Sequence, residues 1–117
     1  LIGYQSNIMS NINTQKLDND TLKRLRGIGH KLKPIVSIGG QGLSPSVLGE
    51  LERALTDHEL VKVRLPAGNK EERDALSAQL AKDSQALLIH HVGRMALLLR
   101  HNPQANPKLS NLVRFGG

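Results

Sequence analysis

The stretch from residue 33 to residue 48 constrains the fold more than any other part of the chain. Residues 35–38 contain three β-branched side chains, which is typical of a short strand covered by helices. Ser44 followed by Pro45 is typical of a helix N-terminus. Between them lies a segment that we call the glycine loop, made of Gly39, Gly40, Gln41 and Gly42. The pattern predicts a bare loop beside the positive end of a helix dipole, which is chemically suited to binding phosphate.

Size and composition limit the class of protein. With 117 residues we expect a single folded domain, and because only Tyr4 and Phe115 are aromatic its core has to be aliphatic. The chain contains no cysteine, which excludes disulfides, thiolate metal sites and thiol nucleophiles. No apolar run approaches the roughly 18 residues of a membrane span. We therefore expect a soluble, cytoplasmic protein without a membrane segment and without a cofactor.

The formal net charge of +6 favours a polyanionic partner. No acidic residue lies between Thr21 and Gly49, so much of the positive charge is close in sequence to the glycine loop. A solvated helix face is the simpler interpretation of these positions, and contact with phosphate is the hypothesis that their proximity to the loop favours. The five basic residues of this group are Lys23, Arg24, Arg26, Lys31 and Lys33.

The first part of the chain divides into a leader and a helix. Residues 1–16 lack a convincing period and are expected to form a flexible leader, with Met9 as a possible natural start and residues 1–8 excluded from the fold. From Asp18 onward, an apolar stripe predicts a short helix that ends at Gly27 or Gly29.

The remaining pattern predicts five further elements. Residues 45–58 have a helical inner face that includes His58, and residues 60–65 alternate as in a strand. Asn69 or its neighbour caps a helix with Ala75, Leu76 and Leu80 inward, and residues 86–92 and 95–100 form an antiparallel hairpin. The order is αβαβαββ, an α/β fold whose four-stranded mixed sheet is covered by helices. Residues 102–117 are expected to be a loosely ordered tail, in which four residues are apolar enough to dock: Leu109, Leu112, Val113 and Phe115.

Catalytic signals are weak throughout the sequence. The adjacent His90 and His91 point to opposite faces of a strand and do not readily hold one ion. His58, at a helix end, is expected to contact the terminal carbonyls of its own helix. No set of carboxylates, Ser/His/Asp triad or zinc spacing rises above chance, and the Gly-Lys-Ser/Thr of a P-loop and the G-x-G-x-x-G of a dinucleotide site are both missing. We expect a protein that is not an enzyme and has no small-molecule substrate.

Several segments together resemble the CRM domain, the chloroplast RNA splicing and ribosome maturation module, in its stand-alone bacterial YhbY-like form. They are Leu-Arg-Gly at 25–27, His-Lys-Leu-Lys-Pro at 30–34, the glycine loop, Asp-His-Glu-Leu-Val-Lys-Val at 57–63, Val-Gly-Arg at 92–94 and Leu-Arg at 99–100. The resemblance spans residues 17–101. It implies a fold similar to the C-terminal domain of bacterial translation initiation factor 3, RNA binding through a GxxG loop like that of KH domains, and association with precursors of the large ribosomal subunit.

The resulting hypothesis is a monomeric, non-catalytic RNA-binding protein that assists assembly of the large ribosomal subunit. With so few aromatic side chains, binding is expected to be mostly electrostatic. The alternatives are an adaptor whose basic face docks on an acidic ribosome-associated protein and, less favoured, an enzyme acting on a small phosphorylated molecule. The residues expected to contact RNA are Gly39, Gly40, Gln41, Gly42, Lys23, Arg26, Lys31, Lys33, Arg53, Arg94 and Arg100.

Overall fold

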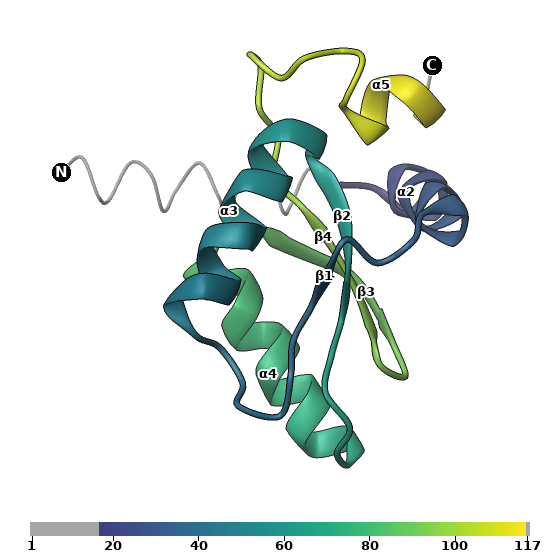
Figure 1. The fold of residues 1–117 in the computed structure, drawn as a ribbon. Helices are drawn as coiled ribbons and strands as arrows, with labels where there is room; N and C mark the ends of the chain where they lie inside the picture. The colour runs from purple at the N-terminus through teal and green to yellow at the C-terminus, as the bar shows by residue number, and fades with distance from the viewer. Residues whose placement is uncertain (1–16, 117) are drawn as a thin grey trace, which may run out of the picture.

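The computed structural model describes residues 17–116, so the predicted leader lies outside the described part of the chain. Its elements follow the predicted order, and a further short helix ends the chain (Figure 1). Among the described residues, no helix is both long enough and apolar enough to cross a membrane. The elements are α2 (Asn19–Lys31), β1 (Val36–Ser37), α3 (Pro45–His58), β2 (Leu60–Arg64), α4 (Lys70–Asp83), β3 (Leu87–Val92), β4 (Met95–Leu99) and α5 (Asn111–Gly116).

The predicted four-stranded mixed sheet is confirmed, with strand order β1-β2-β4-β3. β1 is parallel to β2, whereas β2 and β3 are both antiparallel to β4. β1 has only two residues, but its flanks continue the pairing because the Ile35 and Ile38 amides donate to the carbonyls of Lys62 and Arg64 at 3.0 and 2.9 Å.

Helices cover both faces of the sheet (Figure 1). On one face, α3 and α4 pack against the larger core, whose fully buried residues include Leu55, Val63 and Leu98. On the other face, α2 and α5 pack against a smaller core, where Leu25 and Ile28 of α2 meet Leu97 of β4. In Figure 1 the hairpin of β3 and β4 extends below α2, so this helix covers only part of its face of the sheet.

The prediction that α2 ends at Gly27 or Gly29 is wrong, because the helix continues through both to Lys31. The two glycines have different surroundings. A Cβ atom added to Gly27 would meet nothing within 4 Å, whereas one on Gly29 would lie 2.7 Å from Cδ2 of Leu97. Gly29 therefore allows the helix to pack closely on β4. This packing, and not the end of a helix, is the reason for a glycine at this position.

The predicted starts of α3 and α4 are confirmed. Oγ of Ser44 accepts from the Val47 amide at 3.1 Å, and Asn69 forms a reciprocal capping box with Glu72. The inward face of α4 was only partly predicted. Leu80 is buried, but Ala75 is exposed and the buried position beside it is Ser77, whose hydroxyl donates to the Asp74 carbonyl at 2.9 Å.

The tail is held against the domain, in contrast to the loosely ordered segment expected from its sequence. Its anchor is Glu59, a buried carboxylate at the end of α3 with a left-handed backbone at φ 62°. Glu59 accepts from the Ser110 hydroxyl at 2.8 Å and from the Asn102 amide at 2.7 Å. Of the four apolar tail residues only Leu112 packs against the smaller core, whereas Leu109, Val113 and Phe115 are exposed.

His58 takes part in the same attachment. Its Nδ1 lies 2.8 Å from the Leu109 carbonyl oxygen, which can only accept, so Nδ1 donates to the tail. The expectation that His58 contacts the carbonyls of its own helix is wrong, since this ring bonds a residue 51 positions away.

Candidate nucleic-acid interface

The glycine loop is an open turn at the end of β1. The Gly42 amide donates to the Gly39 carbonyl at 3.0 Å, and Gly42 has a φ of 78°, which favours glycine. Gly39, Gly40 and Gln41 are exposed. A Cβ atom at Gly39, Gly40 or Gly42 would meet nothing within 4 Å, so there is open space directly above these three glycines. A ligand backbone can therefore approach the loop without meeting a side chain.

The helix that follows the loop presents an unneutralised N-terminus. The first turn of α3 contains no acidic residue, whereas the first turns of α2 and α4 do. Pro45 contributes no N–H, and Ser44 already caps the Val47 amide. The positive end of the α3 dipole therefore lies beside the loop without a carboxylate in its first turn.

The sheet face beneath and beyond α2 changes from apolar to cationic toward the loop. Paired residues share a face, so three rows cross the sheet. Leu87, Leu99 and Leu60 form the row that is covered by the helices. The second row is His90, Leu97 and Lys62, and the third is Val92, Met95, Arg64 and Ser37. We call the third row together with Lys62 and His90 the open sheet face.

Arg94 and the glycine loop meet at the same end of the sheet. The Ile38 amide donates to the Arg64 carbonyl, and the next residue, Leu65, donates from its amide to the Arg94 carbonyl at 2.7 Å. The guanidinium Nε of Arg94 in turn donates to the Leu65 carbonyl at 3.0 Å. Two consecutive residues of the chain thus connect the loop and Arg94. Arg94 and the loop therefore lie at the same end of the sheet.

Arg26 lies beside the open sheet face. It lines a cavity between α2 and the sheet together with His30, Lys62 and His90. Burial lowers the pKa of His90 below its ordinary value, and the charges of Arg26, His30 and His91 lower it further. His90 and His91 do point to opposite faces, since Nδ1 of His91 lies 2.9 Å from Asp74 on α4. The cavity is therefore cationic on several sides.

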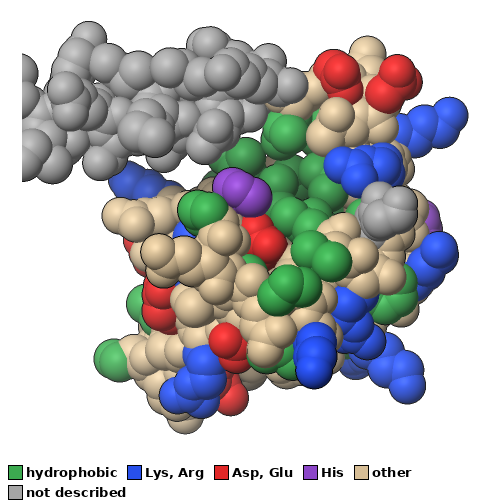
Figure 2. Space-filling model, turned by 90° about the horizontal axis from the view of Figure 1, so that it is seen from above, with side chains coloured by type: hydrophobic (Ala, Val, Ile, Leu, Met, Phe, Trp, Pro, Cys, Tyr) green, Lys and Arg blue, Asp and Glu red, His purple; other side chains and the backbone are tan. Residues whose placement is uncertain are grey.

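Three other basic positions are less close to the loop than the sequence suggested. Lys31 is the last residue of α2 and Lys33 lies three residues before β1, whereas the glycine loop follows β1. Gly39 lies six positions after Lys33, a stretch that would span at most about 20 Å if fully extended at roughly 3.3 Å per residue. Lys23 is exposed on α2, about two turns before Lys31. Figure 2, seen from above, shows Lys and Arg side chains gathered on the side of the molecule where α2 lies.

Arg53 and Arg100 are in different surroundings from the loop. Arg53 is exposed on α3 and lines a surface hollow with Glu50 and Asp57, two carboxylates that offset its charge. Arg100 follows β4 at the end opposite Arg94. Its Nη2 and Nη1 atoms lie 2.7 and 2.8 Å from Oε2 and Oε1 of the Glu52 carboxylate.

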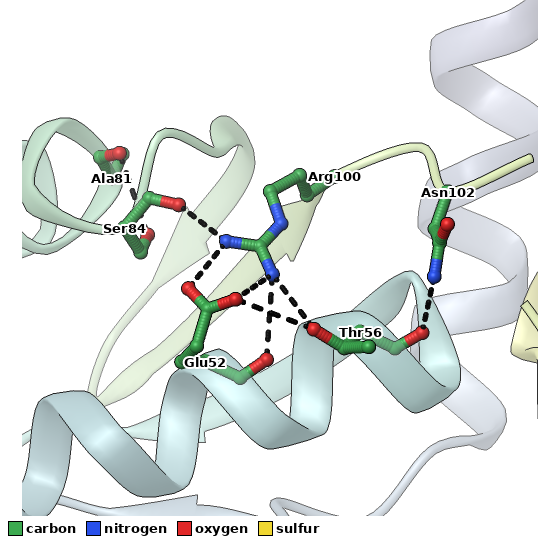
Figure 3. A network of polar contacts seen from close by, with 6 residues as sticks. All are labelled: Glu52, Thr56, Ala81, Ser84, Arg100 and Asn102. Carbon is green, nitrogen blue, oxygen red and sulfur yellow. Dashed lines mark hydrogen bonds and ion pairs between the residues drawn. The ribbon is translucent and has the colours of Figure 1, made fainter. Parts of the chain in front are cut away.

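The Arg100 guanidinium also donates to the Ser84 carbonyl at 3.0 Å and to the Thr56 hydroxyl at 3.1 Å (Figure 3). The hydrogen bond from Arg100 to the Glu52 carboxylate lowers the pKa of that carboxyl, and the charge of Arg100 and the hydrogen bond from Thr56 lower it further. The contacts of Arg100 join β4 to α3 and to the end of α4. The structure therefore assigns Arg100 to holding the fold together and does not bring it to the glycine loop.

Two histidines that line the cavity were missed as site candidates from the sequence. His30 and His90 come together only when α2 lies across the sheet, 60 positions apart in the chain. Lys62 and Arg64 carried a detectable signal, because the alternation of residues 60–65 places both on the face away from the larger core. Within the described part of the chain, no cluster of three or more His, Asp or Glu residues is arranged to hold a metal ion.

The chain is similar to several known proteins. It is 45% identical over 101 residues to a Pseudomonas aeruginosa protein named as a probable RNA-binding protein, covering 86% of this chain and 97% of that one. It is 33% identical over 85 residues to an RNA-binding protein of Haemophilus influenzae, covering 73% and 86% of the two chains. The solution structure of a hypothetical protein from Staphylococcus aureus has the same fold, with a TM-score of 0.67 and 22% identity over 76% of this chain and 93% of that one.

The match to a family model covers nearly all of the described domain. Residues 17–100 match the model of the CRS1 / YhbY (CRM) domain, which begins just before α2 and ends after β4. This confirms the resemblance drawn from the sequence segments between α2 and β4. The chain belongs to the CRS1 / YhbY (CRM) domain family.

Proposed function

We propose that this protein binds RNA, and that its target is ribosomal RNA in precursors of the large ribosomal subunit, whose assembly it assists. Two relatives with substantial identity are named as RNA-binding proteins, which supports RNA as the ligand. The observation that carries the proposal is the open glycine loop, which shares one end of the sheet with cationic side chains. A ribose-phosphate backbone matches both the open space and the charge.

In this proposal the RNA backbone approaches the glycine loop at the point where no side chain stands in its way. Amide groups of the loop and the positive end of α3 meet one phosphate, as expected for anions at helix N-termini. Arg94 and Arg64 neutralise neighbouring phosphates from the adjacent strand ends. Such contacts position the backbone and carry little sequence information, so binding is weakly sequence-selective.

A double substitution of the loop tests this proposal. Gly40→Asp with Gln41→Asp adds two negative charges at exposed positions, and the open space at Gly40 lets the fold stay intact. We expect binding to a single-stranded ribosomal RNA fragment, measured by fluorescence anisotropy, to be abolished. The matched control is Pro103→Asp with Gln104→Asp, which adds the same charge to an exposed turn after the other end of β4. Unchanged affinity of the loop variant would remove the loop from the mechanism.

The identity of the RNA requires a separate experiment. Crosslinking the protein to RNA in cells and sequencing the attached fragments should recover precursors of the large-subunit RNA. Ribonuclease treatment of the native complex distinguishes the alternative adaptor function, because an adaptor stays with its protein partner whereas a protein held by RNA is released. Recovery of unrelated RNAs with no enrichment for ribosomal sequences would contradict the proposed target.

A further inference from the structure

The cavity between α2 and the sheet is small and has two chemically distinct parts. Its volume is about 190 Å³, roughly the share of six water molecules in the liquid. The floor is apolar and includes Leu97 and Met95 of β4. The rim is formed by four basic or titratable side chains, Arg26, His30, Lys62 and His90.

The cavity exists because α2 stops short of the end of the sheet. Gly29 brings the helix onto Leu97, and beyond this contact the strands continue without cover. Val92, in the next row, lines the cavity and is 58% exposed. Apolar side chains on a concave surface favour a partner that removes them from water.

Charge restricts what this partner is. Of the described residues, none that lines the cavity is acidic. On its own face of the sheet, His90 has Arg26 and His30 from α2 and Lys62 from β2 across Leu97 as its basic neighbours, while His91 points to the opposite face, so Arg26 and Lys62 place positive charge beside the cavity without a compensating carboxylate in it. A ligand with an apolar face and a negative charge beside it satisfies both the floor and the rim.

We propose that this cavity accepts one unstacked base of single-stranded RNA, with the face of the base on Leu97 and Met95 and its flanking phosphates on Arg26 and Lys62. The inference rests on the proposed RNA-binding function and adds a base site to it. Single-stranded RNA is commonly recognised by splaying out a base onto an apolar or planar side-chain surface. The open sheet face continues from Lys62 to Arg64, about 7 Å along β2, and so leads from the cavity to the glycine loop.

No Phe, Tyr or Trp lines this cavity among the described residues, so the planar groups available to the base are the imidazole rings of His30 and His90 and the Arg26 guanidinium. Guanidinium planes stack on bases, and the thioether of Met95 is polarisable and adapts to an aromatic ring. The cavity is below the size range of pockets for drug-sized ligands, which suits a single heterocycle rather than a whole nucleotide.

Methionine NMR provides a direct test, because the chain contains only two methionines, Met9 and Met95. With ¹³C-methyl-labelled methionine, and with Met95→Leu to assign the signals, the Met95 methyl is followed during titration with a short oligouridylate. A base over the floor shifts this methyl signal upfield through its ring current. Titration with polyphosphate, which carries the charge without bases, should produce no upfield shift of the Met95 methyl signal. An equal shift with polyphosphate would overturn the base assignment.

Matched histidine variants provide the second measurement. His90→Ala should weaken oligouridylate binding by about tenfold, the scale of one lost base contact. His91→Ala, its neighbour on the opposite face, should change affinity by less than about twofold. If the amides of the glycine loop shift with oligouridylate but the Met95 methyl does not, the base site is refuted and RNA binding stands. If neither responds, the proposed function fails as well.

Discussion

The two glycines inside α2 allow a paired substitution whose outcome follows from the structure. Gly27→Ala adds a methyl group in open space, whereas Gly29→Ala places it 2.7 Å from Cδ2 and 3.1 Å from Cδ1 of Leu97. Leu97 is only 4% exposed, so its side chain has to shift within the smaller core. Both substitutions replace a glycine in the interior of the same helix, and therefore share the same gain in helix propensity.

The magnitudes can be worked from these contacts. Replacing an interior helical glycine with alanine stabilises by about 0.5–1 kcal/mol, which is the expected result for Gly27→Ala. Overpacking of a core costs about 1–3 kcal/mol, so Gly29→Ala should range from nearly neutral to about 2 kcal/mol destabilising. Because the propensity gain is common to both variants, their free energies of unfolding should differ by about 1–3 kcal/mol.

Urea unfolding followed by circular dichroism measures this difference. The slope of the free energy with urea concentration should be the same for both variants, since each affects the unfolded chain alike. For a domain of this size a difference of 1 kcal/mol corresponds to about 4–8 °C in melting temperature, which is readily resolved. If Gly29→Ala stabilises the protein as much as Gly27→Ala does, the close approach of α2 to β4 is not a constraint and our reason for Gly29 is wrong.

Three further predictions concern charge. Arg100→Met should destabilise the domain by about 1–2 kcal/mol, because the Ser84 carbonyl and the Thr56 hydroxyl lose their donor. The affinity of this variant for RNA should change by less than about twofold. A large loss of RNA affinity with normal stability would show that Arg100 contacts RNA. The pKa of His90 is lowered from 6.5 in the folded protein. Between this lowered pKa and pH 6.5, the unfolded chain therefore binds a proton at His90 that the native state does not bind. The free energy of unfolding should fall as the pH drops through this interval. His90→Gln should remove this part of the pH dependence, and identical pH profiles for the two proteins would contradict the assignment. If about five phosphates of single-stranded RNA are neutralised, the logarithm of the binding constant should fall with the logarithm of salt concentration at a slope of roughly −3 to −4, whereas a flat dependence would exclude phosphate-led binding.

Local signals predicted most of the secondary structure and one part of the candidate site. The glycine loop, the Ser44 cap and the capping box at Asn69 are made of residues a few positions apart, and their geometry depends on little else. The same holds for the hairpin of residues 87–99, whose turn at Gly93 has a φ of 58°. These features agree with the expectations because each is stabilised by its own neighbours in sequence.

The errors have a common origin in contacts between distant parts of the chain. The local sequence around Gly29 predicts a helix end, but this glycine allows α2 to pack on Leu97. The tail has few apolar residues, yet the buried carboxylate of Glu59 holds it through Ser110, 51 positions away. Neither the hydrophobic period nor the secondary-structure propensity of either segment indicates which distant residue it contacts.

The amino-acid sequence by itself determined the order of elements, the open loop and the excess of positive charge, since helix caps, glycine conformations and strand alternation are local properties. Only the tertiary structure decided which cations share a surface with that loop. β1 separates Lys31 and Lys33 from the loop, and the Glu52 carboxylate binds Arg100, whereas strand pairing places Arg64 and Arg94 beside the loop. The physical reason is that charges act through distance in space, and the sheet sets those distances.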